Sequence, residues 1–360
     1  MPGSPAASFT FTGGPVFDID AAPNGNVLVA ETVLDGVASG PTTIWEIVTR
    51  GRGGTSELVQ FSTPGGITPV NGLATVGRGS FFAARGGLDL AENAAVLHVT
   101  PAGARVVGDV EAFEKAEDPD LTGSAAWKDG ACAAASGPFT PGPQSNPFHL
   151  AAVSGSTVLL ADAAGNTLLR VGKDGDVELV ALFTPPADGG GASDDPTDWL
   201  EFPFEPADDG FCFVQPVPNS VAVGPDGGIY VGELTGVGAL GVSRVWRIAP
   251  GATDVVCPSA DCTVAFSDFT SIIDLAFGPD GDLHVVEYDE AGWLTSVGVG
   301  TPEGGTVNRC DVEAGSCEIA TIGDEVLEEL TFPAALTFDR TGGAWLLENN
   351  LAAPTVRKLN

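Results

Sequence analysis

One hairpin pattern recurs along the whole chain and constrains the fold more than any other feature. In its most complete copy, residues 215–236, an apolar run at 220–223 leads through Pro225-Asp226-Gly227 into a second run that stops at Glu233. Proline presets the first turn angle and glycine accepts a positive φ, so this pattern predicts a tight β-hairpin. Both runs are rich in β-formers and too short for helices, which indicates strands.

The same turn recurs five more times. The further copies are Asn24-Gly25, Arg78-Gly79, Ser154-Gly155, Asp280-Gly281 and Thr341-Gly342. A third apolar segment follows in each of the six copies, at residues 44–47, 96–99, 168–171, 245–248, 307–310 and 355–358. The copies average about 60 residues, longer than the ~40–50 of common propeller repeats, so we expect insertions.

These repeats predict one all-β domain over residues 1–360, a six-bladed β-propeller of the NHL/YWTD-like type. Ser8-Phe9-Thr10-Phe11 precedes the first repeat, and the last repeat ends at residues 356–359 without a fourth strand. We therefore expect the N-terminal strand to become the outer strand of the last blade, which closes the ring and removes its exposed seam.

Two segments, 111–146 and 184–216, interrupt the repeat. Both fall between the outer strand of one blade and the inner strand of the next, so the alternation of strand direction places both on one face. We expect them to form a loop cap over that face. Their aromatic side chains either line a ligand entrance or form a small core of the cap itself.

The strongly acidic composition argues against nucleic acid and anionic membranes as partners. The formal net charge of −33 leaves no basic stripe to bind nucleic acid or an anionic membrane. No apolar run approaches the length needed to span a bilayer, and the first residues lack the basic start and apolar centre of a signal peptide. We expect a monomer, with any signal peptide absent from this sequence.

The six cysteines predict disulfides, because none forms a CxxC pair and three histidines are too few for zinc sites. Disulfides indicate an oxidising compartment, so we expect a secreted or extracytoplasmic protein. The expected pairs are Cys257–Cys262 and Cys310–Cys317 as local staples, and Cys132–Cys212 between the two insertions.

The residues seven positions before each turn, with the third blade shifted by one, should form a ring at the tunnel mouth on the capped face. They are Asp18, Gly72, His149, Ser220, Asp274 and Ala335, with Asn71 and Asn219 one residue earlier in their blades. Oxygen ligands suit Ca²⁺ or another divalent metal, so Asp18, Asn219 and Asp274 are candidate metal ligands. If the protein is an enzyme, His149 and Asp274 are its candidate catalytic residues. Alternatively, the acids cap backbone N–H groups and His149 is only hydrogen-bonded.

A second ring lies six residues past the turns and carries acids in five of six blades, which indicates a structural role. Its members are Glu31, Arg85, Asp162, Glu233, Glu287 and Glu348. The exception, Arg85, pairs with a neighbouring acid or with an anionic ligand. The candidate ligand-binding residues are therefore Asn71, Arg85, Asn219 and Ser220. No GxSxG, HExxH or phosphate-binding glycine loop occurs.

Five segments together resemble the ScyD/ScyE family of bacterial NHL-type six-bladed propellers. They are SNPFHL from Ser145, ADAAGNTLLRV from Ala161, QPVPNSVAVGPDGGIYVGELTG from Gln215, SRVWRI from Ser243 and FTSIIDLAFGPDGDLHVVE from Phe269. More distantly, the chain is similar to gluconolactonase-type and streptogramin-lyase-like propellers, which use metals on the central axis. The lactonase-like enzymes place a Glu, Asn and Asp set there, and this chain offers Asn219 and Asp274 with Asp18 for the third.

Two hypotheses follow. In the first, the chain is a non-catalytic scaffold that binds a small molecule or a protein on the capped face and needs no cofactor. In the second, it is a metal-dependent lactonase-like hydrolase or lyase that acts at the tunnel mouth.

Overall fold

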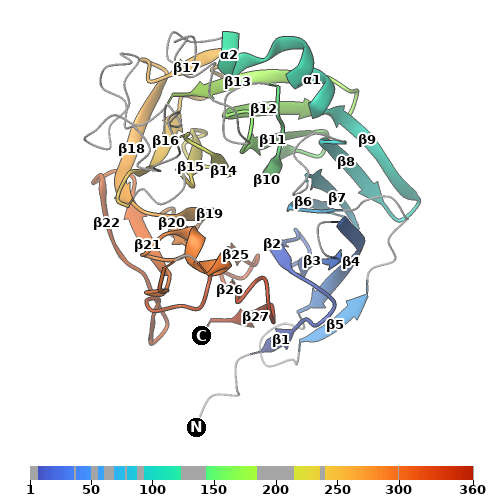
Figure 1. Cartoon of the computed structure of the whole chain (residues 1–360). Helices are drawn as coiled ribbons and strands as arrows, with labels where there is room; N and C mark the ends of the chain where they lie inside the picture. Colours follow the sequence, from blue (N-terminus) through green and yellow to red (C-terminus); the bar gives the residue numbers. More distant parts are fainter. Residues whose placement is uncertain are drawn as a thin grey trace.

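The computed structural model describes residues 7–35, 38–49, 56–60, 69–77, 79–86, 93–122, 143–184, 215–235, 240–298 and 300–359. These residues form six sheets around a central axis, which confirms the six-bladed β-propeller (Figure 1). Blade 1 contains β2 (Val16–Ala21), β3 (Val27–Asp35), β4 (Ala38–Val48) and β5 (Glu57–Gln60). Blade 2 contains β6 (Gly72–Gly77), β7 (Ser80–Arg85), β8 (Ala95–Thr100) and β9 (Gly103–Asp109). Blade 3 contains β10 (Pro147–Ser154), β11 (Thr157–Asp162), β12 (Thr167–Gly172) and β13 (Val177–Phe183).

The other three blades follow the same order from the axis outwards. Blade 4 contains β14 (Pro218–Val223), β15 (Ile229–Glu233), β16 (Ser243–Ile248) and β18 (Cys262–Phe269). Blade 5 contains β19 (Ile272–Phe277), β20 (Leu283–Glu287), β21 (Thr306–Asp311) and β22 (Ser316–Ile319). Blade 6 contains β25 (Ala335–Phe338), β26 (Ala344–Glu348), β27 (Thr355–Lys358) and β1 (Ser8–Thr10).

The recurring turn chemistry explains why each blade begins with a hairpin. In blade 4, Val223 pairs with Ile229 across the turn, and Gly227 takes a φ of 77°, which glycine adopts without strain. Alternate residues of the inner strands then pack between blades. Val221 and Val231, for example, share one buried cluster with Trp246 of the same blade and Leu159 of blade 3.

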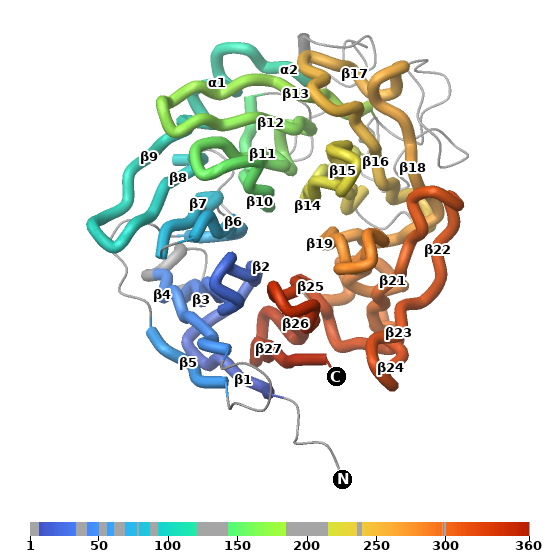
Figure 2. Tube along the Cα trace, turned by 180° about the vertical axis from the view of Figure 1, so that it is seen from behind, coloured from blue at the N-terminus to red at the C-terminus, as the bar shows by residue number. Residues whose placement is uncertain are grey.

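The N-terminal strand closes the ring as the sequence predicts. Strand β1 pairs antiparallel with β27, and Phe9 lies opposite Val356. Phe11 is buried, and its backbone N–H donates to the carbonyl of Pro354 at 2.8 Å. The two strands lie side by side in both views of the ring (Figures 1 and 2).

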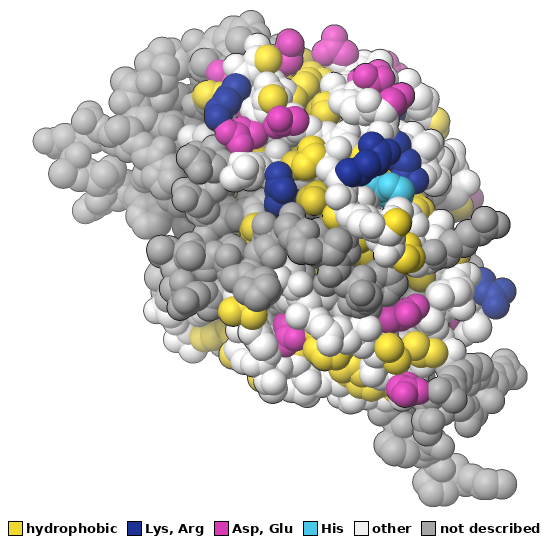
Figure 3. Space-filling model, turned by 90° about the vertical axis from the view of Figure 1, so that its right-hand side faces the viewer, with side chains coloured by type: hydrophobic (Ala, Val, Ile, Leu, Met, Phe, Trp, Pro, Cys, Tyr) yellow, Lys and Arg dark blue, Asp and Glu magenta, His cyan; other side chains and the backbone are white. Residues whose placement is uncertain are grey.

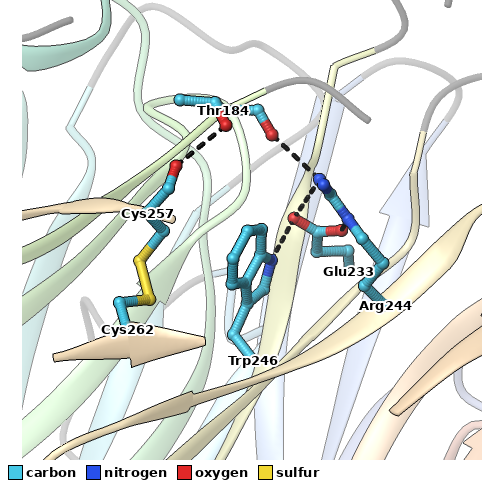
Figure 4. Close-up of a disulfide and its surroundings, with 6 residues drawn as sticks. All are labelled: Thr184, Glu233, Arg244, Trp246, Cys257 and Cys262. Atoms are coloured by element: carbon cyan, nitrogen blue, oxygen red, sulfur yellow. Dashed lines mark hydrogen bonds and ion pairs between the residues drawn. A yellow bond between two sulfur atoms is a disulfide. The ribbon is translucent and has the colours of Figure 1, made fainter. Parts of the chain in front are cut away.

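Two disulfides are confirmed, Cys257–Cys262 and Cys310–Cys317. The second staples β21 to β22 within blade 5. The first has a longer reach than expected, because β17 (Val255–Cys257) joins blade 3 by pairing parallel with β13. Since Cys262 lies on β18 of blade 4, this disulfide connects two neighbouring blades (Figure 4). Cys132 and Cys212 lie outside the described residues, so their pairing stays a prediction.

Several elements depart from the expected pattern. The first insertion begins with helix α1 (Val110–Glu117) and the short helix α2 (Pro119–Thr122) where only loops were expected. Asp109 caps α1 by accepting from the backbone N–H of Ala112, which explains why a helix begins there. A 3₁₀ helix, Trp293–Val297, follows β20, and the hairpin β23 (Thr321–Ile322) and β24 (Glu325–Val326) lies between blades 5 and 6. Residues 123–142 and 185–214 lie outside the described part of the chain, so the cap stays a prediction.

Candidate functional site

Three residues of the predicted tunnel ring meet on the central axis. Asp18, His149 and Asp274 belong to blades 1, 3 and 5, and in each blade a register shift interrupts the pairing of the inner strand beside them. Such bulges re-aim side chains. The other three blades carry Gly72, Ser220 and Ala335 at this level, and these small residues leave room for the imidazole.

The imidazole of His149 lies between the two carboxylates. Its Nε2 is 3.4 Å from Oδ1 of Asp18 and 3.1 Å from Oδ1 of Asp274. The second oxygen of each acid accepts a backbone N–H from the next blade, Leu73 for Asp18 and Leu336 for Asp274, both at 2.7 Å. The acids therefore do cap backbone groups, and they hold the imidazole at the same time.

This arrangement favours a protonated histidine. Burial alone would lower the pKa of His149, but the carboxylates of Asp18 and Asp274 outweigh it and raise the pKa to about 9. Burial raises the pKa of Asp274 to about 6, against the opposing effect of His149. The raised pKa of His149 therefore favours an imidazolium paired with both carboxylates. The assignment of Asp18, Asn219 and Asp274 as metal ligands stays a prediction.

A cavity of about 400 Å³ extends from this ion pair along the axis. It is lined by His149 and Asp274 at one end and reaches the hairpin turns of the blades, where Val223 is 38% exposed and Arg340 lines it. The cavity exists because the residues two positions past the ring are small in five blades. In blades 2 to 6 these are Ala74, Ala151, Ala222, Ala276 and Thr337, and blade 1 carries Asp20 at this position. The hairpin turns lie on the face opposite the expected cap, so this is a different entrance from the one that the sequence predicts.

Asp20 is the acidic member of that second level and was not among the residues predicted from the sequence. Its Oδ2 accepts the backbone N–H of Thr75 at 2.5 Å, and burial followed by the nearby charge of Asp18 raises its pKa to about 6. The signal was available, because residues at i and i+2 of a strand face the same side and Asp18 already faced the tunnel. Its carboxylate lines the cavity beside Ala21 and Ala22.

The two predicted asparagines connect neighbouring blades. Nδ2 of Asn71 donates to the carbonyl of Pro147 at 3.0 Å, and Nδ2 of Asn219 donates to that of Ile272 at 2.9 Å. Within the described part of the chain, Oδ1 of Asn219 and Oγ of Ser220 are buried without a hydrogen-bond partner. A ligand-binding role for either remains a prediction.

The remaining candidates lie away from the tunnel. Arg85 donates to the carbonyl of Asn93 at 2.8 Å, and its charge acts on Glu111, an acid on α1. On the side of the ring, basic side chains gather beside a histidine (Figure 3). His98 lies opposite Arg105 in the β8–β9 pair, and burial together with Lys173 and Arg105 lowers the pKa of His98. His284 is buried, which lowers its pKa too.

The second ring of acids forms structural networks. Glu31 accepts the indole N–H of Trp45 at 2.8 Å, and Glu287 accepts Nδ2 of Asn308 at 2.7 Å. Glu233 has an additional partner that the repeat pattern does not predict, because Arg244 forms a buried bidentate pair with it (Figure 4). Trp246 donates its indole N–H to the same carboxylate at 2.5 Å.

A third polar group lies at the start of the first insertion. Glu114, Asp118 and Asp120 offer one oxygen each, and these oxygens all lie within 4.8 Å of one another. Glu114 is fully buried, and burial followed by the charge of Asp162 raises its pKa to about 10. These carboxylates could hold a metal ion, whereas the sequence predicted metal ligands only at the tunnel mouth.

No family model matches the chain, and no curated protein does. Solved structures resemble it along nearly its whole length. A putative oxidoreductase (glucose dehydrogenase) from Thermus thermophilus is 16% identical with a TM-score of 0.51, over 98% of this chain and 100% of that one. A protein of unknown function from Bacteroides thetaiotaomicron is 11% identical with a TM-score of 0.52, over 99% and 72%. A putative gluconolactonase is 12% identical with a TM-score of 0.48, over 99% and 93%.

At these identities the likeness shows the fold alone. Fold and site together define the class of the protein, a six-bladed β-propeller with a carboxylate–imidazole cluster on its axis. The two disulfides fit an oxidising, extracellular location. None of the helices in the described residues is long and apolar enough to cross a membrane.

Proposed function

We propose that the chain is a secreted, ScyD/ScyE-like propeller that binds a small molecule in its central tunnel without catalysing a reaction. The observation that carries this proposal is the cavity of about 400 Å³ that ends at His149 and Asp274. Its volume lies within the range of small-molecule sites, roughly 300–1,000 Å³, which combine apolar walls with a few placed polar groups.

The chemistry of the lining indicates the ligand class. Leu150, Val221 and Leu275 contribute apolar surface, whereas the carboxylates of Asp20 and Asp274 accept hydrogen bonds at the inner end. Three aspartates and one imidazolium leave a net negative charge there. A ligand with an apolar body and a positively charged or hydrogen-donating head fits this combination.

The same geometry argues against catalysis. A general base must present a lone pair to the substrate, yet Nε2 of His149 lies between two carboxylates that favour its protonated form. Each carboxylate is also fixed by a backbone N–H of the next blade. These groups stabilise one another and form a recognition surface.

A thermal-shift screen tests the proposal with alkylamines, amino sugars and the uncharged alcohols of the same shape, followed by calorimetric titration of the hits. We expect amines to bind, and Asp20→Asn to weaken binding at least about 10-fold by removing a charge-assisted contact. Asp174→Asn, an exposed aspartate at a blade 3 turn, is the matched control and should bind as the wild type does. If no amine binds, or if Asp20→Asn leaves binding unchanged, the proposal is wrong.

Elemental analysis tests the alternative of a metal-dependent lactonase-like enzyme. That alternative requires a stoichiometric metal that Asp274→Ala removes, and our proposal requires that no tunnel metal is present.

A further inference from the structure

The acidic group at the start of the first insertion carries the further inference. We propose that Glu114, Asp118, Asp120 and Asp162 bind one Ca²⁺ ion between the helices α1–α2 and blade 3. This site is separate from the tunnel and from the proposed ligand.

Local backbone geometry brings the first three carboxylates together. Asp118 ends α1 in the left-handed conformation, with φ 43° and ψ 64°, and its N–H donates to the carbonyl of Glu114. Pro119 then begins α2, and Asp120 follows it directly, so the end of α1 and the start of α2 bring Asp118 and Asp120 to Glu114. One oxygen from each of the three acids lies within 4.8 Å of the others.

Asp162 brings a further carboxylate next to Glu114, from the end of β11. It is fully buried, and its Oδ1 accepts the backbone N–H of Asn146 at 2.6 Å. Among the described residues its Oδ2 has no hydrogen-bond partner. A Cβ placed on Gly165 would lie 3.3 Å from that oxygen and 3.2 Å from Oε2 of Glu114, so both oxygens flank one point that glycine leaves open.

Glu114 is the strongest sign that the group has a ligand. Its side chain is fully buried, and neither carboxylate oxygen has a hydrogen-bond partner within the described ranges. Buried carboxylates are costly unless they are paired or coordinate a metal. No described Lys, Arg or His forms an ion pair with Glu114 or Asp162.

The chemistry of the four ligand side chains indicates which metal ion the site would bind. All four side chains offer oxygen, and neither histidine nor cysteine is among them, which indicates a hard cation. Ca²⁺ accepts six to eight oxygens in a flexible arrangement and suits a site assembled from a helix, a helix end and a strand end. Asn166 positions one ligand, because its Nδ2 donates to Oδ2 of Asp120 at 3.1 Å. The same amide donates to Oε1 of Gln215 at 3.2 Å, so the ion would stabilise the place where the first insertion leaves blade 2 and the second rejoins blade 4.

Calorimetric titration of the full chain with CaCl₂, after removal of metals with a chelating resin, tests the site. We expect one Ca²⁺ per chain and a rise in Tm on its addition. Glu114→Gln, which keeps the shape and removes one charge, should weaken binding at least about 10-fold because affinity depends on ligand charge. Asp162→Asn should weaken it similarly, so that the test survives if one variant fails to fold.

Two controls locate the ion. Glu117→Gln changes an exposed residue of the same helix, and Asp274→Asn removes a tunnel carboxylate. Both should bind Ca²⁺ as tightly as the wild type. Absence of binding by the wild type up to millimolar Ca²⁺, unchanged affinity in Glu114→Gln, or loss of binding in Asp274→Asn would each overturn the proposal.

Discussion

Replacing His149 by glutamine removes the positive charge between Asp18 and Asp274 and leaves two buried carboxylates facing each other. We expect this substitution to cost the most stability below about pH 6.5, still ~2.5 kcal/mol near pH 7 and almost nothing above about pH 9.5. The reason is that His149, with a pKa of about 9, stays protonated in the folded state at pH values where the unfolded chain, with an ordinary pKa of 6.5, has released the proton.

The magnitude follows from the two pKa values of His149. A rise from 6.5 to about 9 stabilises the charged imidazole by ~3 kcal/mol relative to the neutral one. This contribution is fully present below the unfolded-state pKa and is lost as the pH rises through the folded-state pKa. The charge of His149 therefore contributes ~2.5 kcal/mol near pH 7 and almost nothing above about pH 9.5.

Two measurements check this expectation. Because the chain contains three histidines, an NMR titration of the imidazole Cε1–H signals resolves each one. We expect one histidine to titrate near 9 and two, His98 and His284, to titrate below 6.5. The high signal should disappear in His149→Gln and should move down in Asp274→Asn, which removes one of the two charges that raise it.

Urea unfolding of the wild type and of His149→Gln at a series of pH values then gives the energy. The difference in unfolding free energy should shrink towards pH 9.5, whereas His98→Gln should show no such trend. A titration in which all three histidines have a pKa at or below 6.5, or a constant cost of His149→Gln from pH 6.5 to 9.5, would refute the reasoning.

Three further predictions concern the framework. Arg244→Ala should lower the free energy of unfolding, measured by chemical denaturation, by about 3–5 kcal/mol because it leaves Glu233 buried without its cation. Arg247→Ala breaks an exposed ion pair on the same strand and should lower it by at most about 1 kcal/mol. Deletion of residues 1–11 should lower the Tm and cause concentration-dependent association, measured by light scattering, because it exposes the edge of β27. Deletion of residues 1–6 alone should change neither the Tm nor the association. An unchanged Tm in the longer deletion would contradict ring closure by β1. Mass mapping of the unreduced protein should find three bonded pairs and no free thiol, and six free thiols would contradict a secreted protein; the pairs are Cys257–Cys262, Cys310–Cys317 and Cys132–Cys212.

The sequence could predict what repeats. Turn residues at fixed offsets identify the hairpins, and the alternation of strand direction then places Asp18, His149 and Asp274 on one axis, where the structure has them. It could not predict that the imidazole would lie between the carboxylates. The number of residues from the hairpin turn predicts how deep in the tunnel a residue lies, but it does not predict the direction of a side chain at a β-bulge.

What does not repeat could not be found in this way. Arg244 directly precedes the third strand segment of blade 4, where no other blade carries an arginine, so the comparison between blades gives it no signal. The arginine that pairs with the equivalent acid of blade 6, Glu348, is Arg357, at a different position of the repeat. Strand β17 leaves blade 4 and adds to blade 3, which depends on the free edge of β13 and not on any local pattern. Glu114 and Asp120 lie on helices within an insertion, and their meeting with Asp162 of blade 3 is a tertiary contact between segments that share no register.

Ring closure by β1 also has a consequence for the order of events in synthesis. The hydroxyls of Thr10 and Thr355 lie 3.2 Å apart in the finished ring, although 345 positions separate them in the chain. At a ribosomal rate of about 5–20 residues per second, the first strand waits ~20–70 s for its partner to be made. During that time blades 1 to 5 are synthesised, and the ring cannot close before β27 follows them. A three-residue β1 with polar Ser8 and Thr10 at its ends offers little edge for wrong pairing while it waits.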